Sequence, residues 1–166
     1  LTVKEIDGPD GNRLPLHIFT PAASTPRPLG CIYHIHGGGY IAGSPDQYEF
    51  ILRPLAEELG CAIISVDYRL APENPHPAPV EDCYAGLAWT VSQAVELGID
   101  PARIGLMGES AGGGLAAALA LMVRDRGLAP RDPHRAADRP AQGQRHRRPH
   151  PAGDGGVLIR ARRPHD

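Results

Sequence analysis

Ser110 lies in the run Gly108-Glu109-Ser110-Ala111-Gly112, which fits the pattern G-x-S-x-G of a nucleophile elbow. A strand-like run, residues 103–107, precedes it, and a helix-like run rich in Ala and Leu, residues 110–126, follows it. A helix that begins at the serine favours negative charge developing on a substrate. The alternative is a glycine-rich turn without chemistry, but the strand-to-helix context favours a serine nucleophile.

A second glycine motif, His36-Gly37-Gly38-Gly39, follows another strand-like run. Successive glycines let backbone N–H groups approach a substrate oxygen closely, as an oxyanion hole requires. A phosphate-binding loop is the alternative, but the GxxxxGK[ST] pattern is absent. We expect His36 to orient this loop rather than to act as a base.

Alternating apolar runs and helical spacing indicate the elements that position these motifs. Strands are predicted over residues 2–6, 14–20, 29–35, 61–66 and 103–107, and helices over residues 44–59, 80–95 and 110–126. The first helix should begin at a capping box at Ser44, bend at Pro54 and end before Gly60. Such alternation predicts an α/β fold, a mostly parallel sheet with helices on both faces. Both glycine motifs then lie at the carboxyl ends of strands, where such sheets bind ligands.

Other polar residues precede the serine in the chain. Asp67 follows the strand 61–66 and could be a catalytic acid by its residue type. In folds with a G-x-S-x-G elbow, however, the acid follows the serine in the chain. We therefore interpret Asp67 as structural, bracing its loop through Arg69. His17, His34 and His76 are likewise interpreted as structural or solvated.

Together the motifs resemble the hormone-sensitive-lipase-like (HGGG-type) esterase family of α/β-hydrolases. The resemblance rests on residues 36–39, 67–73, 75–78 and 108–113, and extends from about residue 2 to 127. It implies hydrolysis of a small-molecule carboxylic ester, without a metal or cofactor, by Ser110 as nucleophile. It also implies oxyanion donors at Gly38, Gly39 and Ala111, supported by His36, Gly37, Gly108 and Gly112.

The chain departs from this family in two ways. Glu109 stands where many members carry Asp, and the later strands with the family's Asp-Pro-x-x-Asp and His-Gly stretches are not recognisable. We therefore expect a truncated α/β-hydrolase fold with an exposed apolar edge at residues 104–107, no recognisable triad acid or base, and little turnover. The Asp and His residues of the C-terminal stretch lack the context of those two family stretches: Asp132, Asp138, Asp154, Asp166, His134, His146, His150 and His165.

The balance of charged side chains also changes where the resemblance ends, near residue 129. Residues 1–129 carry 8 basic and 15 acidic side chains, whereas residues 130–166 carry 9 basic and 4 acidic ones. We predict a partial α/β-hydrolase domain over 1–129 and an Arg/Pro-rich, disordered tail over 130–166. The tail resembles a wrong-frame translation of a GC-rich gene, a hypothesis that translating the other reading frames beyond residue 127 would test.

Composition narrows the remaining choices. Cys31, Cys61 and Cys83 are widely spaced and suggest no metal site, and with no visible secretory leader they favour a cytoplasmic protein. No apolar run is long enough to span a bilayer. Alternatives to an esterase are an inactive hydrolase-fold ligand-binding protein, a non-functional gene fragment, a nucleic-acid-binding tail, and a dyad completed by a tail histidine such as His134. We expect no nucleic-acid partner, and the sequence leaves the oligomeric state open.

Overall fold

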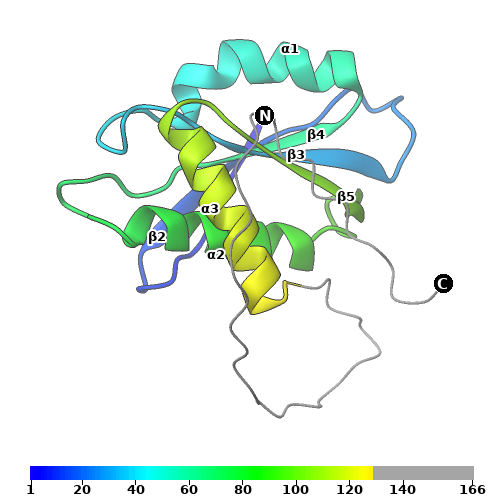
Figure 1. Cartoon of the computed structure of the whole chain (residues 1–166). Helices are drawn as coiled ribbons and strands as arrows, with labels where there is room; N and C mark the ends of the chain where they lie inside the picture. Colours follow the sequence, from blue (N-terminus) through cyan, green and yellow to red (C-terminus); the bar gives the residue numbers. More distant parts are fainter. Residues whose placement is uncertain (129–166) are drawn as a thin grey trace, which may run out of the picture.

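A computed structural model describes residues 1–128 of the chain as a five-stranded sheet in the order β1-β2-β4-β3-β5, with helices on both faces (Figure 1). The strands are β1 (Thr2–Asp7), β2 (Arg13–Phe19), β3 (Leu29–Ile35), β4 (Ala62–Val66) and β5 (Ile99–Gly108). The helices are the short 3-10 helix η1 (Pro45–Tyr48), α1 (Glu49–Leu59), α2 (Ala78–Ser92) and α3 (Ala111–Arg126). The predicted tail over 130–166, including His134, lies outside the described residues.

Among the strands that the structure describes, the two that precede the glycine motifs, β3 and β5, and their neighbour β4 are parallel. β3 pairs in parallel with β4 on one side and with β5 on the other. β2 runs antiparallel to both β1 and β4. The sheet is therefore mixed, with its parallel half next to the candidate site. Within residues 1–128, β5 pairs with β3 alone, so it is the edge strand that the sequence predicted, and Ile104, Leu106 and Met107 on it are half-buried.

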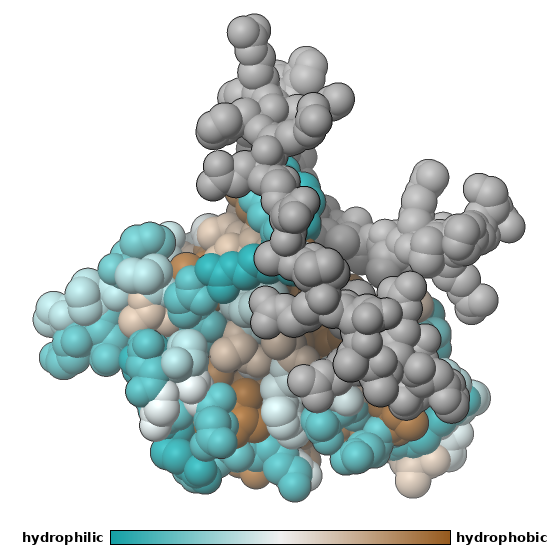
Figure 2. All heavy atoms as spheres, turned by 90° about the horizontal axis from the view of Figure 1, so that it is seen from below, coloured by the Kyte–Doolittle hydropathy of each residue, from teal (hydrophilic) through white to brown (hydrophobic). Residues whose placement is uncertain are grey.

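The sheet separates two hydrophobic clusters. On one face α1 packs through Leu52 and Ala56 onto Phe19 and Ile63. The other face, covered by α2 and α3, carries the larger cluster. Seen from below Figure 1, toward the α2 and α3 side, the surface of the described residues mixes hydrophilic side chains with small apolar areas (Figure 2).

The helix ends show where local signals sufficed. Gly60 and Gly127 adopt left-handed conformations directly after α1 and α3, as the sequence predicted. The prediction of a capping box at Ser44 was wrong. The Ser44 side chain makes no capping hydrogen bond, and the short helix η1 lies between Ser44 and the start of α1 at Glu49. No helix within residues 1–128 combines the length and apolarity needed to cross a bilayer.

Candidate active site

The turn between β5 and α3 places Ser110 at its tip. β5 ends at Gly108, α3 begins at Ala111, and Ser110 between them has φ 54° and ψ −117°. A positive φ is unusual for a residue with a side chain and marks local backbone strain. Ser110 is exposed, and its hydroxyl makes no hydrogen bond within residues 1–128. This geometry presents the hydroxyl to solvent at the N-terminus of α3.

The glycines on either side of Ser110 are required by close backbone contacts. A Cβ on Gly108 would lie 2.3 Å from the carbonyl oxygen of Gly112, across the turn. A Cβ on Gly112 would lie 2.0 Å from the carbonyl oxygen of Ile35, at the end of β3. The turn can therefore be this sharp, and this close to β3, only with glycine at both positions.

The glycine loop after β3 packs directly against this turn. A Cβ on Gly37 would lie 2.9 Å from the carbonyl oxygen of Glu109 and 3.6 Å from the Cβ of Ser110. Gly38 and Gly39 then take positive φ values of 123° and 63° as the loop turns away from the sheet. The two motifs, separated by about seventy residues of sequence, thus meet at the carboxyl ends of β3 and β5.

Three backbone donors at this meeting point are free. The N–H groups of Gly38, Gly39 and Ala111 donate no hydrogen bond to any residue in the described part of the chain. Unpaired N–H groups next to an exposed serine are what an oxyanion hole needs. The structure therefore brings together the residues that the sequence proposed as nucleophile and donors.

His36 is a buried support of the loop. Its Nδ1 lies 2.8 Å from the carbonyl oxygen of Gly37, and its ring stacks on Tyr68 with centroids 4.2 Å apart. The Tyr68 hydroxyl donates to the His36 carbonyl oxygen at 2.9 Å. Burial lowers the pKa of His36, which keeps the ring neutral, with Nδ1 donating to Gly37. These contacts fit an orienting role.

His34 and His17, which were interpreted as structural from the sequence, are both buried. His34 bonds to Ser65 and Glu109, and His17 lies buried with Nδ1 3.5 Å from an Asp46 carboxylate oxygen. Burial raises the pKa of Asp67.

The expected partnership between Asp67 and Arg69 was wrong. Arg69 instead donates to Asp82, which is fully buried at the start of α2, at 2.8 Å from Nε and 3.0 Å from the backbone N–H. A second partner of Arg69 is Asp10 in the turn between β1 and β2. Asp82 was not singled out from the sequence, because its contact with Arg69 depends on how α2 docks.

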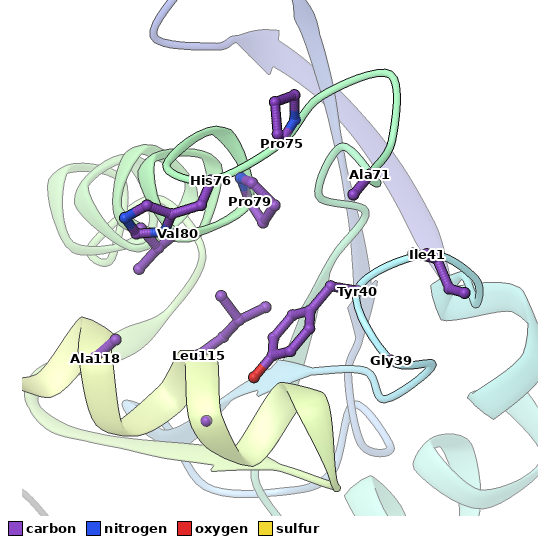
Figure 3. A pocket seen from close by; sticks show the side chains of 11 residues that line it. Gly39, Tyr40, Ile41, Ala71, Pro75, His76, Pro79, Val80, Leu115 and Ala118 are labelled. Atoms are coloured by element: carbon purple, nitrogen blue, oxygen red, sulfur yellow. The ribbon is translucent and has the colours of Figure 1, made fainter.

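A cavity of about 430 Å³ opens beside the glycine loop and along α3 (Figure 3). Its walls are the loop residues that follow the glycines, the Pro-rich segment before α2, and one side of α3. The lining residues are Gly39, Tyr40, Ile41, Ala71, Pro75, His76, Pro79, Val80, Gly114, Leu115 and Ala118. The lining is mostly apolar, so the cavity suits an apolar group of a ligand. The sequence did not predict it, because its walls come from three separate segments.

Tyr40 and Tyr48 are further site residues that sequence reasoning missed. Tyr40 has φ 68°, and its hydroxyl reaches α3 beside Gly114. The Tyr48 hydroxyl accepts a hydrogen bond from the Gly37 N–H at 3.2 Å. The aromatic residue directly after three glycines was the only local signal for Tyr40. Among residues 1–128, no three His, Cys, Asp or Glu side chains are grouped as a metal ion requires.

Comparison with known proteins agrees with the fold described above. A sequence model described as alpha/beta hydrolase fold matches residues 32–146. An arylesterase of Saccharolobus solfataricus is 44% identical over 115 residues, which are 69% of this chain and 37% of that protein. Human hormone-sensitive lipase is 39% identical over 113 residues, 68% of this chain and 10% of the lipase.

The described fold also matches solved structures of esterases. A bacterial heroin esterase superimposes with a TM-score of 0.72 at 43% identity, covering 78% of this chain and 41% of the esterase. The chain thus spans little more than a third of the length of the curated arylesterase and of a carboxylesterase of Mycobacterium tuberculosis.

Proposed function

The chain belongs to the α/β-hydrolase family, and we propose that it carries the nucleophile and oxyanion hole of a carboxylic ester hydrolase that acts on small-molecule esters. The single observation that carries the proposal is Ser110, held at positive φ in a turn against which the glycine loop packs through Gly37. Within residues 1–128 the N–H groups of Gly38, Gly39 and Ala111 donate no hydrogen bond. Esterases among its relatives and structural neighbours support the reaction type.

The proposed reaction begins with attack of the Ser110 hydroxyl oxygen on the ester carbonyl carbon. Negative charge then develops on the carbonyl oxygen, where the three N–H groups can donate to it. Collapse of this tetrahedral intermediate breaks the bond to the alkoxy oxygen, which leaves as the alcohol after taking up the proton that the Ser110 hydroxyl lost. An acyl group remains on Ser110, and water removes it as the free acid. Each N–H donor of this kind contributes about 3 kcal/mol to lowering the barrier.

Proton transfer is the step that the described residues do not supply. No histidine within residues 1–128 hydrogen-bonds to Ser110, and His34 and His36 are held by other partners. Without a base the hydroxyl stays protonated and is a weak nucleophile. Hydrolases that lose a triad member keep roughly 10³–10⁴-fold catalysis over water. We therefore propose that this chain by itself turns over esters slowly.

Covalent labelling tests the proposal. The chain is incubated with a fluorophosphonate, the modified residue is located by mass spectrometry, and hydrolysis of a p-nitrophenyl ester is followed in parallel. We expect slow modification confined to Ser110 and none in Ser110→Ala, while Ser92→Ala, which removes an exposed serine of α2, labels like the unmodified chain. Labelling of Ser110 no faster than of Ser92 would refute its role as nucleophile. Rapid labelling of Ser110 would instead refute the impairment.

The cavity favours a second candidate, a ligand-binding protein on a hydrolase fold. Its volume of about 430 Å³ and its apolar walls are those of a small-molecule site. Saturable binding of an apolar ligand without any covalent labelling would favour this function over hydrolysis. A cytoplasmic location remains our proposal, and the three free cysteines, with Cys31 and Cys83 buried, support it.

A further inference from the structure

A buried imidazole lies directly beneath the nucleophile turn. The His34 side chain is fully buried. Its Nε2 lies 3.0 and 3.2 Å from the two carboxylate oxygens of Glu109, the residue before Ser110. Its Nδ1 lies 2.7 Å from the hydroxyl oxygen of Ser65 on β4. A chain of hydrogen bonds therefore runs from β4 through β3 to the turn after β5.

The register of the sheet explains why these three side chains meet. His34 stands opposite Ser65 on one side and opposite Met107 on the other. Alternate residues of a strand share a face, so Glu109, two residues beyond Met107, can reach toward the same face as His34. This is the α1 face, where Met107 packs with Ile63. The Glu109 side chain is thus held by His34 on the α1 face of the sheet, whereas α3 packs on the opposite face.

The protonation of this chain of hydrogen bonds is well defined. A carboxylate only accepts hydrogen bonds, so Nε2 of His34 carries the proton that it donates to Glu109. Burial lowers the pKa of His34 although the Glu109 charge opposes that shift, and the ring is therefore neutral near pH 7. Nδ1 then accepts the proton of the Ser65 hydroxyl. Both ring nitrogens are satisfied, which a buried imidazole requires.

We propose, on the basis of the role proposed for Ser110, that His34 and Glu109 form a latch that positions the nucleophile. Ser110 follows Glu109 directly, so fixing the Glu109 side chain limits how far the strained turn can rotate. The Glu109 carbonyl oxygen also accepts the Gly112 N–H at 2.9 Å and packs against Gly37. His34 acts on Ser110 only through Glu109, and both are positioning residues.

The same imidazole is linked to the glycine loop through Tyr48. The ring of Tyr48 lies 5.3 Å from that of His34, and its hydroxyl accepts the Gly37 N–H. The latch therefore connects the turn that holds the nucleophile with the loop that holds the candidate donors. An Asp at position 109 would have one methylene less with which to reach His34, so we expect it to weaken or break this contact.

The test compares Glu109→Asp, Glu109→Gln, His34→Phe and the double variant His34→Phe/Glu109→Asp in the full chain. The readout is the second-order rate constant for fluorophosphonate labelling of Ser110, with folding checked by near-UV circular dichroism. We expect Glu109→Asp and His34→Phe each to lower the rate constant by about tenfold or more, because small misplacements of a reacting group are costly. Glu109→Gln, whose amide oxygen still accepts from Nε2, should stay within about threefold of the unmodified chain. The double variant should be no slower than the slower single variant.

Glu49→Asp is the matched control, because Glu49 also pairs through its carboxylate, with Arg53, but on the exposed side of α1. Its rate constant should be unchanged. Equal rates for Glu109→Asp and the unmodified chain, or independent losses that multiply in the double variant, would overturn the latch.

A second measurement keeps the test decisive if the unmodified chain is not labelled, an outcome that would count against the proposed function alone. The backbone amide resonances of Ala111 and Gly112, which do not adjoin a substituted residue, should shift in Glu109→Asp and His34→Phe and stay close to their positions in Glu109→Gln. A slowly exchanging Nε2–H resonance of His34 should be lost in Glu109→Asp and kept in Glu109→Gln. Unchanged resonances in Glu109→Asp would overturn the latch, whatever the labelling shows.

Discussion

Gly112 packs its α-carbon directly against the carbonyl oxygen of Ile35, so closely that a Cβ there would lie 2.0 Å from that oxygen. Both groups belong to backbone that cannot move aside easily, since Ile35 ends β3 and Gly112 lies in the first turn of α3. Gly112→Ala should therefore lower the free energy of unfolding by about 3 kcal/mol, as overpacking does at rigid sites. Urea unfolding followed by tryptophan fluorescence measures the loss.

The control for this prediction is Gly30→Ala, at a glycine within β3. A Cβ on Gly30 would meet its nearest neighbours at 3.8 and 3.9 Å, which are ordinary contacts. Its free energy of unfolding should change by less than about 1 kcal/mol. Comparable losses in the two variants would show that the close approach of α3 to β3 is not what requires glycine at position 112.

Removal of the Asp82 carboxylate should be the most damaging change to a charge in the described part of the chain. Asp82 is fully buried and accepts hydrogen bonds from the backbone and guanidinium of Arg69. Asp82→Ala leaves Arg69, which is only 20% exposed, without its main partner, and we expect a loss of about 3 kcal/mol in the free energy of unfolding. Asp10→Ala removes only the exposed partner and should cost less than about 1 kcal/mol. Similar losses in thermal or urea unfolding would contradict this division of roles.

Acid should destabilise the chain through two kinds of group, which begin to act at different pH values. Burial lowers the pKa values of His34 and His36, so the unfolded chain binds protons that the folded chain does not. The free energy of unfolding should therefore fall as the pH drops below about 6.5, by up to about 1.4 kcal/mol per pH unit for each proton taken up. His36→Gln should make this slope shallower between about pH 6.5 and 5.

The second kind of group is the carboxylate of Glu81. Its pKa is lowered by the Arg126 guanidinium at 2.6 Å, so its contribution is present above about pH 4.5 and is lost as the pH falls through the folded-state pKa. Arg126→Ala should change the pH dependence only in this lower range. Unfolding free energies measured by urea titration from pH 7 to 3 check both contributions, and a flat profile between pH 6.5 and 5 in the unmodified chain would refute the histidine contribution.

Local patterns predicted the elements around the site well. The apolar run at 29–35 became β3 with the same bounds, and Gly60 and Gly127 ended α1 and α3 where the pattern placed them. The strand before Ser110 was predicted over 103–107 but begins at Ile99, because pairing of Ile99 with Leu29 extends β5 across Pro101. That pairing depends on a tertiary contact and has no local signal.

The candidate site, too, could be predicted from the sequence only in part. Ser110 and the glycines follow from motif and position, since strand ends of a parallel sheet meet at one edge. The His34–Glu109 contact joins residues 75 apart in sequence, and the Arg69–Asp82 contact depends on how α2 docks. Side chains that meet only through sheet register or helix docking leave no spacing pattern to read.

The contact between Tyr40 and Gly114 controls the shape of the cavity. A Cβ on Gly114 would lie 2.7 Å from the Tyr40 hydroxyl oxygen, the far end of a side chain that can rotate, so Gly114→Ala should be tolerated. Alanine also favours the helix by about 1 kcal/mol over glycine, which offsets the crowding. Tyr40 lines the cavity next to Leu115, so its displacement should change the affinity for an apolar ligand by severalfold while the free energy of unfolding changes by less than about 1 kcal/mol. Binding of a fluorescent naphthalene sulfonate, measured by titration, is the readout.

Ala117→Val is the control, because it adds bulk to an exposed position of α3 outside the cavity and should leave the affinity for the probe unchanged. Equal effects of the two substitutions would mean that the probe does not bind in this cavity.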